Sequence, residues 1–195
     1  MAGLRAKKKE HARATIQKEA LRLFIDQGYD QTTVEQIAES AGVSPATVYR
    51  YFMSKEDLVV TDDYDPLFVS SILERPAGEP LIDSIRAVMT GLLKYFERDR
   101  ELLIARHELR RRTPALQAAH IEEQERSIEL FASLIARHVR RPIDDIDVRI
   151  ACGALVGAMQ EAFGQWLGQG GKGGELRLRE LLNHAIDRIA SALQF

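Results

Sequence analysis

The segment from Thr33 to Phe52, TVEQIAESAGVSPATVYRYF, constrains the fold of this chain more than any other part of the sequence. Its apolar residues recur at the spacing of two short helices, and Gly42 between them permits a tight turn. Thr33 stands three residues before Gln36, which is the spacing of a capping box, and Ser44 precedes a proline suited to the first turn of a helix. The segment therefore predicts two short helices that cross closely.

The second of these helices sorts its side chains by face. Val48 and Phe52 are spaced to enter a core, which leaves Thr47, Tyr49 and Arg50 at the outside or along the edges. The major groove of B-DNA admits one helix, and hydroxyl, aromatic and guanidinium groups suit contacts with phosphates, sugars and base edges. The pattern indicates a helix-turn-helix that reads DNA.

Basic residues gather beside this segment. Residues 1–22 hold seven basic and two acidic residues, whereas the chain beyond residue 60 holds 18 basic and 21 acidic residues. Clustered lysines neutralise phosphates and release counterions without reading base sequence. We expect residues 1–9 to form a flexible basic arm, with a solubilising tail as the alternative, and the first helix to run from about 11 to 27.

The order of the motifs resembles one family. A helix followed by Gly-Tyr, then TTVEQIA, AGVS, TVYRYF and SKEDL, resembles the N-terminal domain of TetR-family bacterial transcriptional regulators over residues 11–60. The resemblance implies an all-α protein of about nine helices. Residues 1–60 would form the three-helix, helix-turn-helix DNA-binding domain, and residues 61–195 an effector-binding and dimerisation domain. A fourth helix, from Ser54 to about Asp63, would join them.

The expected DNA-binding residues come from two arguments. The family resemblance implies contacts from Thr33, Ser44, Thr47, Tyr49, Tyr51 and Lys55, and the exposed start and face of the second short helix add Pro45, Ala46 and Arg50. Tyr51 has an alternative role in packing against the first helix. Thr33 and Ser44 would also serve as caps in a helix pair that does not bind DNA.

Beyond residue 66 the sequence predicts long helices, at about 81–98, 100–112, 114–139, 145–167 and 175–193. The helix at 145–167 is apolar on two faces and therefore needs two partners. TetR-like proteins pair through their last two long helices. The resemblance thus implies that these two helices form a homodimer interface, with a role in the core of one subunit as the alternative. The residues expected at this interface are Leu155, Met159, Phe163, Leu178, Leu182 and Ile189.

The expected regulation follows from the same resemblance. One motif reaches only a few base pairs, so specific affinity requires two copies about one helical turn, or a multiple of it, apart on a pseudo-palindromic double-stranded operator. Fragments such as DDYDP and RRRTPAL are similar to an actinobacterial TetR-like subgroup that includes the mycofactocin-system regulator, which implies a hydrophobic effector such as an acyl-CoA. The pocket candidates are polar residues in apolar surroundings, each of which also suits a surface or interface: Arg86, His107, His120, Gln160 and Trp166.

Other classes of function have little support in the sequence. The stretch GQGGKGG lacks the first glycine and the hydroxyl residue of a phosphate-binding loop, and Arg111 stands where a zinc helix beginning at His107 needs its second histidine. The single Cys152 excludes a disulfide framework. No apolar run is long enough to span a bilayer. We expect no catalytic residue, no metal, no cofactor and no membrane association, and a cytoplasmic protein. A helical interaction protein that does not bind DNA is the main alternative.

Overall fold

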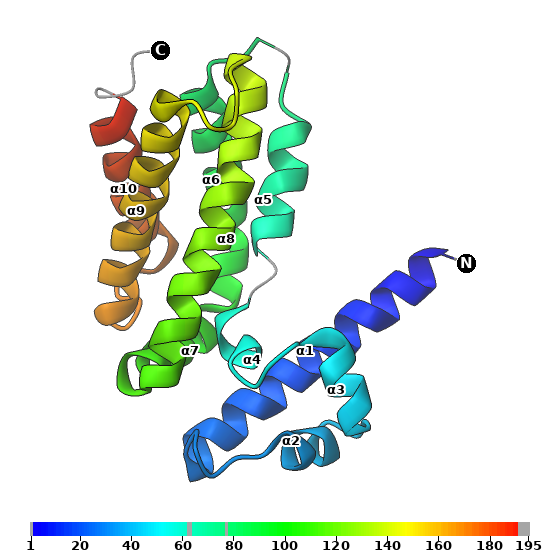
Figure 1. Ribbon diagram of the computed structural model, residues 1–195. Helices are drawn as coiled ribbons and strands as arrows, with labels where there is room; N and C mark the ends of the chain where they lie inside the picture. The colour runs from blue at the N-terminus through cyan, green and yellow to red at the C-terminus, as the bar shows by residue number, and fades with distance from the viewer. Residues whose placement is uncertain (1, 62–63, 77, 191–195) are drawn as a thin grey trace. The chain divides into compact units, whose positions relative to one another are not determined.

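The structure, a computed structural model, describes residues 2–61, 64–76 and 78–190, with side chains from residue 11 onward. Helices are the only regular secondary structure in these ranges (Figure 1). The expected all-α fold is confirmed, with ten helices in the described residues where about nine were expected: α1 Ala2–Gln27, α2 Val34–Ser40, α3 Pro45–Tyr51, α4 Asp57–Val60, α5 Tyr64–Leu73, α6 Leu81–Arg98, α7 Arg100–Arg112, α8 Pro114–Val139, α9 Ile146–Gly168 and α10 Gly174–Ala190.

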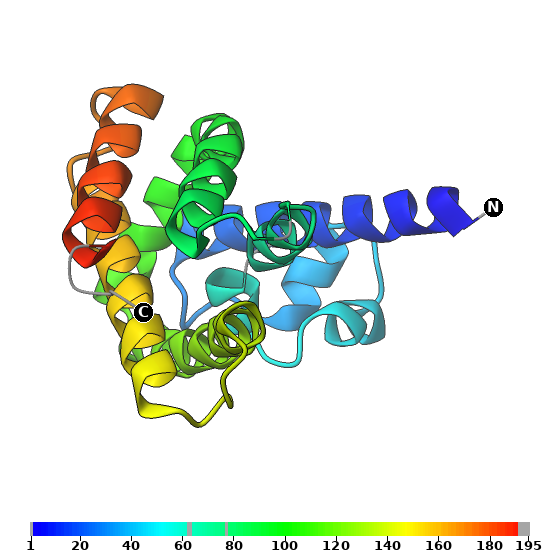
Figure 2. The ribbon, with the colours of Figure 1, turned by 90° about the horizontal axis from the view of Figure 1, so that it is seen from above.

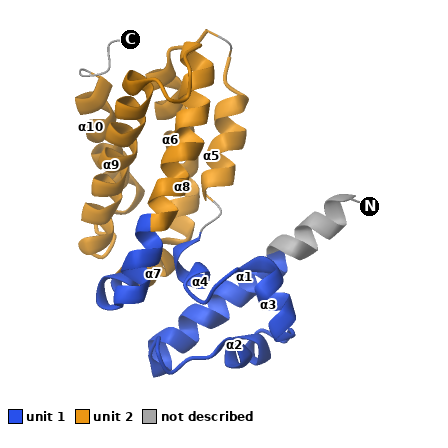
Figure 3. Ribbon diagram, in the orientation of Figure 1, with its two compact units in different colours: residues 1–61, 108–121 blue, residues 62–107, 122–195 orange. Residues whose placement is uncertain are grey.

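The chain divides into two compact units (Figure 3). Unit 1 comprises residues 1–61 and 108–121, and unit 2 comprises residues 62–107 and 122–195. The sequence led us to expect one division at residue 60. The structure divides the chain after Thr61 and also places the end of α7 and the start of α8 in unit 1.

Unit 1 is built around one buried cluster from its short helices. Ile16 and Phe24 of α1, Ile37 of α2 and Val48 of α3 are almost completely inaccessible to solvent. The chain leaves α1 through Gly28, whose φ of 91° favours glycine. Tyr29 then returns to the cluster, with its ring centroid 4.9 Å from that of Phe24.

Two helices of unit 1 differ from their expected bounds. α1 begins at Ala2 instead of His11, so that the expected arm continues the helix from residue 2. Its alanines, lysines, arginine and glutamate are strong helix formers, which outweighs the lack of an apolar period. α4 spans only Asp57–Val60 instead of 54–63, and Thr61 is extended. Residues 62–63, at the expected end of that helix, lie outside the described residues.

Unit 2 contains long helices with a shared apolar core. α9 packs along α10, α10 packs against α6, and α5 packs against α6 (Figures 1 and 2). Aromatic rings interlock edge to face in this core, with 4.7 Å between the ring centroids of Phe68 and Phe131 and also between those of Phe96 and Phe163. Within the ranges described, none of the helices combines the length and the apolar character needed to cross a bilayer.

Candidate nucleic-acid interface

The helix α3 is fixed in place by its cap and two buried residues. The Ser44 hydroxyl accepts a hydrogen bond from the Thr47 amide at 3.2 Å, and Pro45 occupies the first helical position. Val48 and Phe52 are 1% and 2% exposed. Because the buried side of α3 is anchored so firmly, the opposite side is presented in a fixed orientation.

The opposite side of α3 carries the side chains expected to contact DNA. Tyr49 is 52% exposed, and Arg50 and Ala46 are also exposed. Tyr51 packs against the unit 1 cluster, in line with its alternative role, and its half-buried side chain leaves the DNA contact a prediction. The guanidinium of Arg50 lies 5.3 Å from the Tyr51 ring centroid, which is a cation–π distance.

The N-terminus of α2 forms the predicted capping box. The Thr33 hydroxyl accepts from the Gln36 amide at 3.2 Å, and the Gln36 side chain accepts from the Thr33 amide at 2.9 Å. Thr33 itself is exposed. Since amides and the helix dipole favour negative charge at this end, the exposed cap is suited to a phosphate.

Lys55 is tied to the end of α1. Its ammonium group donates a hydrogen bond to the Tyr29 carbonyl and lies 4.2 Å from the centre of the Tyr29 ring. Partial burial lowers the pKa of Lys55, while the nearby acidic groups Asp30 and Glu56 oppose that shift. A phosphate contact would use the remaining N–H groups of a side chain that already joins α1 to the turn before α4.

Two further contacts hold the helix-turn-helix and were not expected from the sequence. The Arg13 guanidinium lies 4.9 Å from the centre of the Phe52 ring, which attaches α1 to the end of α3. Arg22 donates to the Ser40 hydroxyl at 2.9 Å, which attaches α1 to α2. Helical periodicity gives no signal for either contact, because each joins residues far apart in the chain.

The structure distributes the expected effector-binding residues over different places. Arg86 on α6 donates to Asn183 at 3.0 Å and to Asp187 at 2.6 Å on α10. Trp166 is 0% exposed, and its indole N–H has no hydrogen-bond partner among the described residues. The other three are divided between the units: His107 is buried in unit 2, Gln160 is half-buried on α9, and His120 is half-buried in unit 1.

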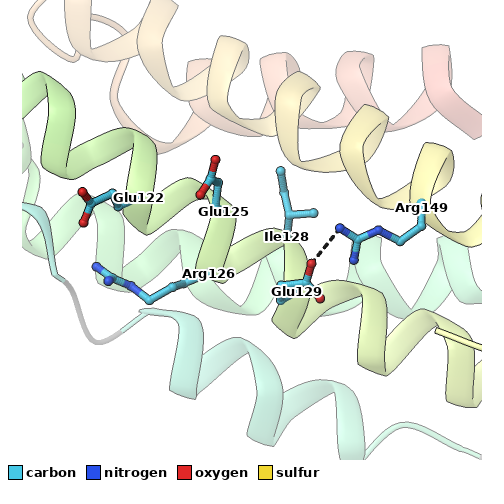
Figure 4. A pocket seen from close by; sticks show the side chains of 6 residues that line it. All are labelled: Glu122, Glu125, Arg126, Ile128, Glu129 and Arg149. Atoms are coloured by element: carbon cyan, nitrogen blue, oxygen red, sulfur yellow. Dashed lines mark ion pairs between the residues drawn. The ribbon is translucent and has the colours of Figure 1, made fainter. Parts of the chain in front are cut away.

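A groove of about 620 Å³ lies on unit 2, along α8 and the start of α9. Arg149 and Glu129 point toward one another in it, with 2.7 Å between guanidinium nitrogen and carboxylate oxygen (Figure 4). Its lining was not expected from the sequence: Glu122, Glu125, Arg126, Ile128, Glu129 and Arg149. Among the described side chains, no group of three or more histidine, cysteine or acidic residues is arranged to hold a metal ion.

The residues expected at the dimer interface lie mainly in the core of unit 2. Five of the six are buried in the protomer and Phe163 is half-buried: Leu155, Met159, Phe163, Leu178, Leu182 and Ile189. A different stripe of α9 is exposed. It contains Ile146 at 68% and Ile150 at 59% exposure, followed by the exposed Ala154 and Gly157.

Comparisons with known proteins match both the helix-turn-helix and the C-terminal helices. The family model of bacterial regulatory proteins, tetR family, matches residues 16–60, and the model of the MftR C-terminal domain matches residues 79–194. The HTH-type transcriptional regulator TcmR of Streptomyces glaucescens is 36% identical over 152 residues, which cover 73% of this chain and 67% of TcmR. MftR of Mycobacterium tuberculosis, whose name links it to mycofactocin biosynthesis, is 26% identical over 181 residues, covering 89% of this chain and 87% of MftR.

A solved structure supports the fold over almost the whole chain. FadR from Bacillus subtilis, in complex with stearoyl-CoA, matches with a TM-score of 0.62 at 20% identity, covering 93% of this chain and 99% of FadR. The fold and the exposed face of α3 define a helix-turn-helix regulator of transcription. The chain belongs to the TetR family of bacterial transcriptional regulators, with a C-terminal domain of the MftR type. The family expected from the sequence is confirmed.

Proposed function

We propose that this regulator is a ligand-released repressor that binds a pseudo-palindromic operator as a homodimer. The observation that carries the proposal is the exposed face of α3, with Tyr49 and Arg50 directed away from a core that holds Val48 and Phe52. A helix anchored on one side and polar on the other fits the major groove.

The side chains of the helix-turn-helix would make two kinds of contact with DNA, to base edges and to the backbone. Arg50 is suited to a guanine edge or a phosphate, and Tyr49 to a sugar or thymine surface with its hydroxyl on a phosphate. The exposed Pro45 and Ala46 offer apolar contact to thymine methyl groups. Thr33, Ser44, Thr47, Tyr51 and Lys55 would fix the register through the backbone, which carries no sequence information.

We place the dimer contact on the exposed stripe of α9. Ile146, Ile150 and Ala154 follow one another at intervals of four and therefore lie on one face of the helix. Open space surrounds Gly153 and Gly157 where a side chain would begin, so a second helix can approach closely. Because Ile146 and Ile150 are 68% and 59% exposed, burial of what remains contributes about 1 to 2 kcal/mol for each. The buried residues of α9 and α10 would support this face from within the protomer.

We propose a hydrophobic effector such as an acyl-CoA, bound in unit 2. The likeness to FadR from Bacillus subtilis, whose structure holds stearoyl-CoA, supports this class. The groove on α8 suits the phosphates of CoA poorly, because three carboxylates line it and Glu129 already pairs with Arg149. A ligand releases DNA only through unequal affinity for two states, and about 1 to 3 kcal/mol of coupling changes DNA affinity roughly 5- to 150-fold.

A reporter driven by the promoter upstream of the gene tests repression. The wild-type protein should lower expression and Tyr49→Ala should restore it, while Gln165→Ala, at an exposed position of unit 2, should behave as wild type. In parallel, stearoyl-CoA should quench or shift the fluorescence of Trp166, the one tryptophan of the chain, and lower DNA affinity. Expression unchanged by the wild-type protein would contradict repression, and an unchanged DNA affinity would contradict this effector.

A further inference from the structure

The corner between α7 and α8 is a fixed part of unit 1. Thr113 alone separates the two helices, it is buried, and its carbonyl accepts hydrogen bonds from the amides of Leu116 and Gln117 at 3.1 Å. Leu116 is 0% exposed in the same cluster that holds Val48 and Phe52 of the helix-turn-helix. The corner therefore shares its core with the DNA-binding helices (Figure 3).

Three consecutive arginines end α7 at this corner, and two of them are open to solvent. Arg111 is exposed and forms no side-chain ion pair among the residues that the structure covers. The Arg112 side chain is 79% exposed and lies 3.9 Å from Glu108, which is itself 58% exposed. An exposed pair at this distance contributes little to stability, so it holds Arg112 weakly.

The corner changes the charge of the DNA-binding unit. Residues 1–61 contain nine basic and eight acidic residues, and residues 108–121 add three arginines and one glutamate. Unit 1 thus has a net charge of +3, of which the corner supplies two charges. Unit 2 contains 15 basic and 20 acidic residues. The unit that contains α3 is therefore net positive and the other unit is net negative. Residues 108–121, which are distant in sequence from α3, add to the positive charge of its unit.

The helix dipole explains only part of this arrangement. The dipole stabilises a cation in the last turn of a helix only modestly, and the effect is confined to that turn. Three adjacent like charges repel one another, and that repulsion is relieved when a polyanion binds. A surface of this kind, joined firmly to a helix-turn-helix, is suited to the phosphates of the same DNA.

We propose that Arg111 and Arg112 form a second phosphate-binding surface, which contacts the operator backbone outside the segments held by α2 and α3. The proposal rests on the DNA-binding function proposed above. The contact is not specific for sequence, and it adds four phosphate contacts per dimer. Each contact releases counterions, so the surface steepens the dependence of DNA affinity on salt.

The test compares two double variants that remove equal charge. Arg111→Gln/Arg112→Gln alters the corner, and Arg137→Gln/Lys172→Gln alters exposed positions of unit 2. With about 0.9 of slope per contact, the corner variant should lower the slope of log K against log salt by about 3 to 4. The affinity ratio of wild type to corner variant should then fall about 100-fold between 50 and 200 mM salt. Arg111→Lys/Arg112→Lys should restore the wild-type slope.

The outcomes separate the inference from the function on which it rests. If the wild-type protein binds its operator and the corner variant keeps the same slope, the second surface is refuted while the function stands. An equal loss of slope in the unit 2 variant would assign the effect to net charge and also refute it. Lysine substitutions that fail to restore the slope would point to a structural role of the arginines. A wild-type protein that does not bind DNA would overturn both proposals.

Discussion

Single residues around α3 show how far the sequence determines the site. The four-residue spacing of Val48 and Phe52 predicted their burial, and the Ser44 cap followed from its position before Pro45. The contact between Arg13 and Phe52 could not be predicted, because it depends on how α1 crosses the end of α3. Periodicity reports which face of a helix is buried, and it does not report which distant residue covers that face.

Phe52 and its neighbour Met53 provide a matched pair for the core of unit 1. Phe52 is 2% exposed and Met53 is 90% exposed. We predict that Phe52→Ala lowers the free energy of unfolding of unit 1 by about 3 to 5 kcal/mol, through lost burial and a cavity. Met53→Ala should change it by less than about 0.5 kcal/mol. Urea unfolding curves of both variants measure this; equal effects would contradict the assignment of the core.

Cys152 gives a prediction for pH. Burial raises the pKa of its thiol to about 11, while the nearby Arg149 acts in the opposite direction, and the thiol donates to the Ile128 carbonyl at 3.1 Å. The native thiol should therefore react slowly with an alkylating reagent at pH 8 and rapidly in denaturant. The pKa of the Cys152 thiol in the folded protein lies above the ordinary value of 9.0. The stability that the neutral, buried thiol contributes is therefore complete below pH 9 and is lost as pH rises toward 11. Rapid alkylation of the native protein at pH 8 would contradict the burial.

Among the helices, proline and capping residues determined which boundaries could be predicted from the sequence. α6, α7 and α8 have the bounds expected from the sequence, 81–98, 100–112 and 114–139; Pro80 precedes α6, and Thr113 and Pro114 mark the boundary between α7 and α8. α4 is shorter than expected at both ends: Ser54 and Asp57 exchange side-chain hydrogen bonds with each other's amides in a turn before the helix, and Thr61 after the helix is extended. Local capping signals therefore located this junction correctly without revealing how long the following helix would be.

The turn between α2 and α3 should depend on its glycine. Gly42 has a φ of 67°, which strains residues that carry a side chain, although open space surrounds the position. Gly42→Ala should destabilise unit 1 by about 1 kcal/mol. Gly91→Ala, at an exposed helical position with equal space, should stabilise the protein by about 0.5 to 1 kcal/mol. Thermal melts show whether each variant raises or lowers the melting temperature. A Gly42→Ala protein more stable than wild type would contradict the left-handed conformation of Gly42 in the turn.

The family and the order of the helices could be predicted from the sequence, whereas contacts between residues distant in sequence came from the structure. The charge pattern near the N-terminus was visible in the sequence, whereas the place of residues 108–121 in unit 1 depends on packing by the buried Leu116 and the partly buried Leu109 and Ala119. The groove on α8 was also missed, since it combines one face of α8 with Arg149 of α9. Patterns along one helix do not show which residues of two helices meet.

The proposed dimer gives a prediction for the oligomeric state. Ile150→Glu should convert the dimer into monomers without loss of the protomer fold, because Ile150 is 59% exposed in the protomer. Leu73→Glu, at a position 56% exposed on α5, should leave the dimer intact. Sedimentation velocity over a range of concentrations measures the mass. A dimeric Ile150→Glu protein of normal stability would place the interface elsewhere.

In the function proposed for this regulator, α3 reads DNA as one of two copies on an operator. The most direct measurement is a binding titration of the protein against its own upstream intergenic DNA at several salt concentrations, with Tyr49→Ala alongside. We expect tight binding by two protomers per site, weakened steeply by salt and strongly reduced in the variant. Binding that does not respond to salt, or that Tyr49→Ala leaves unchanged, would contradict it.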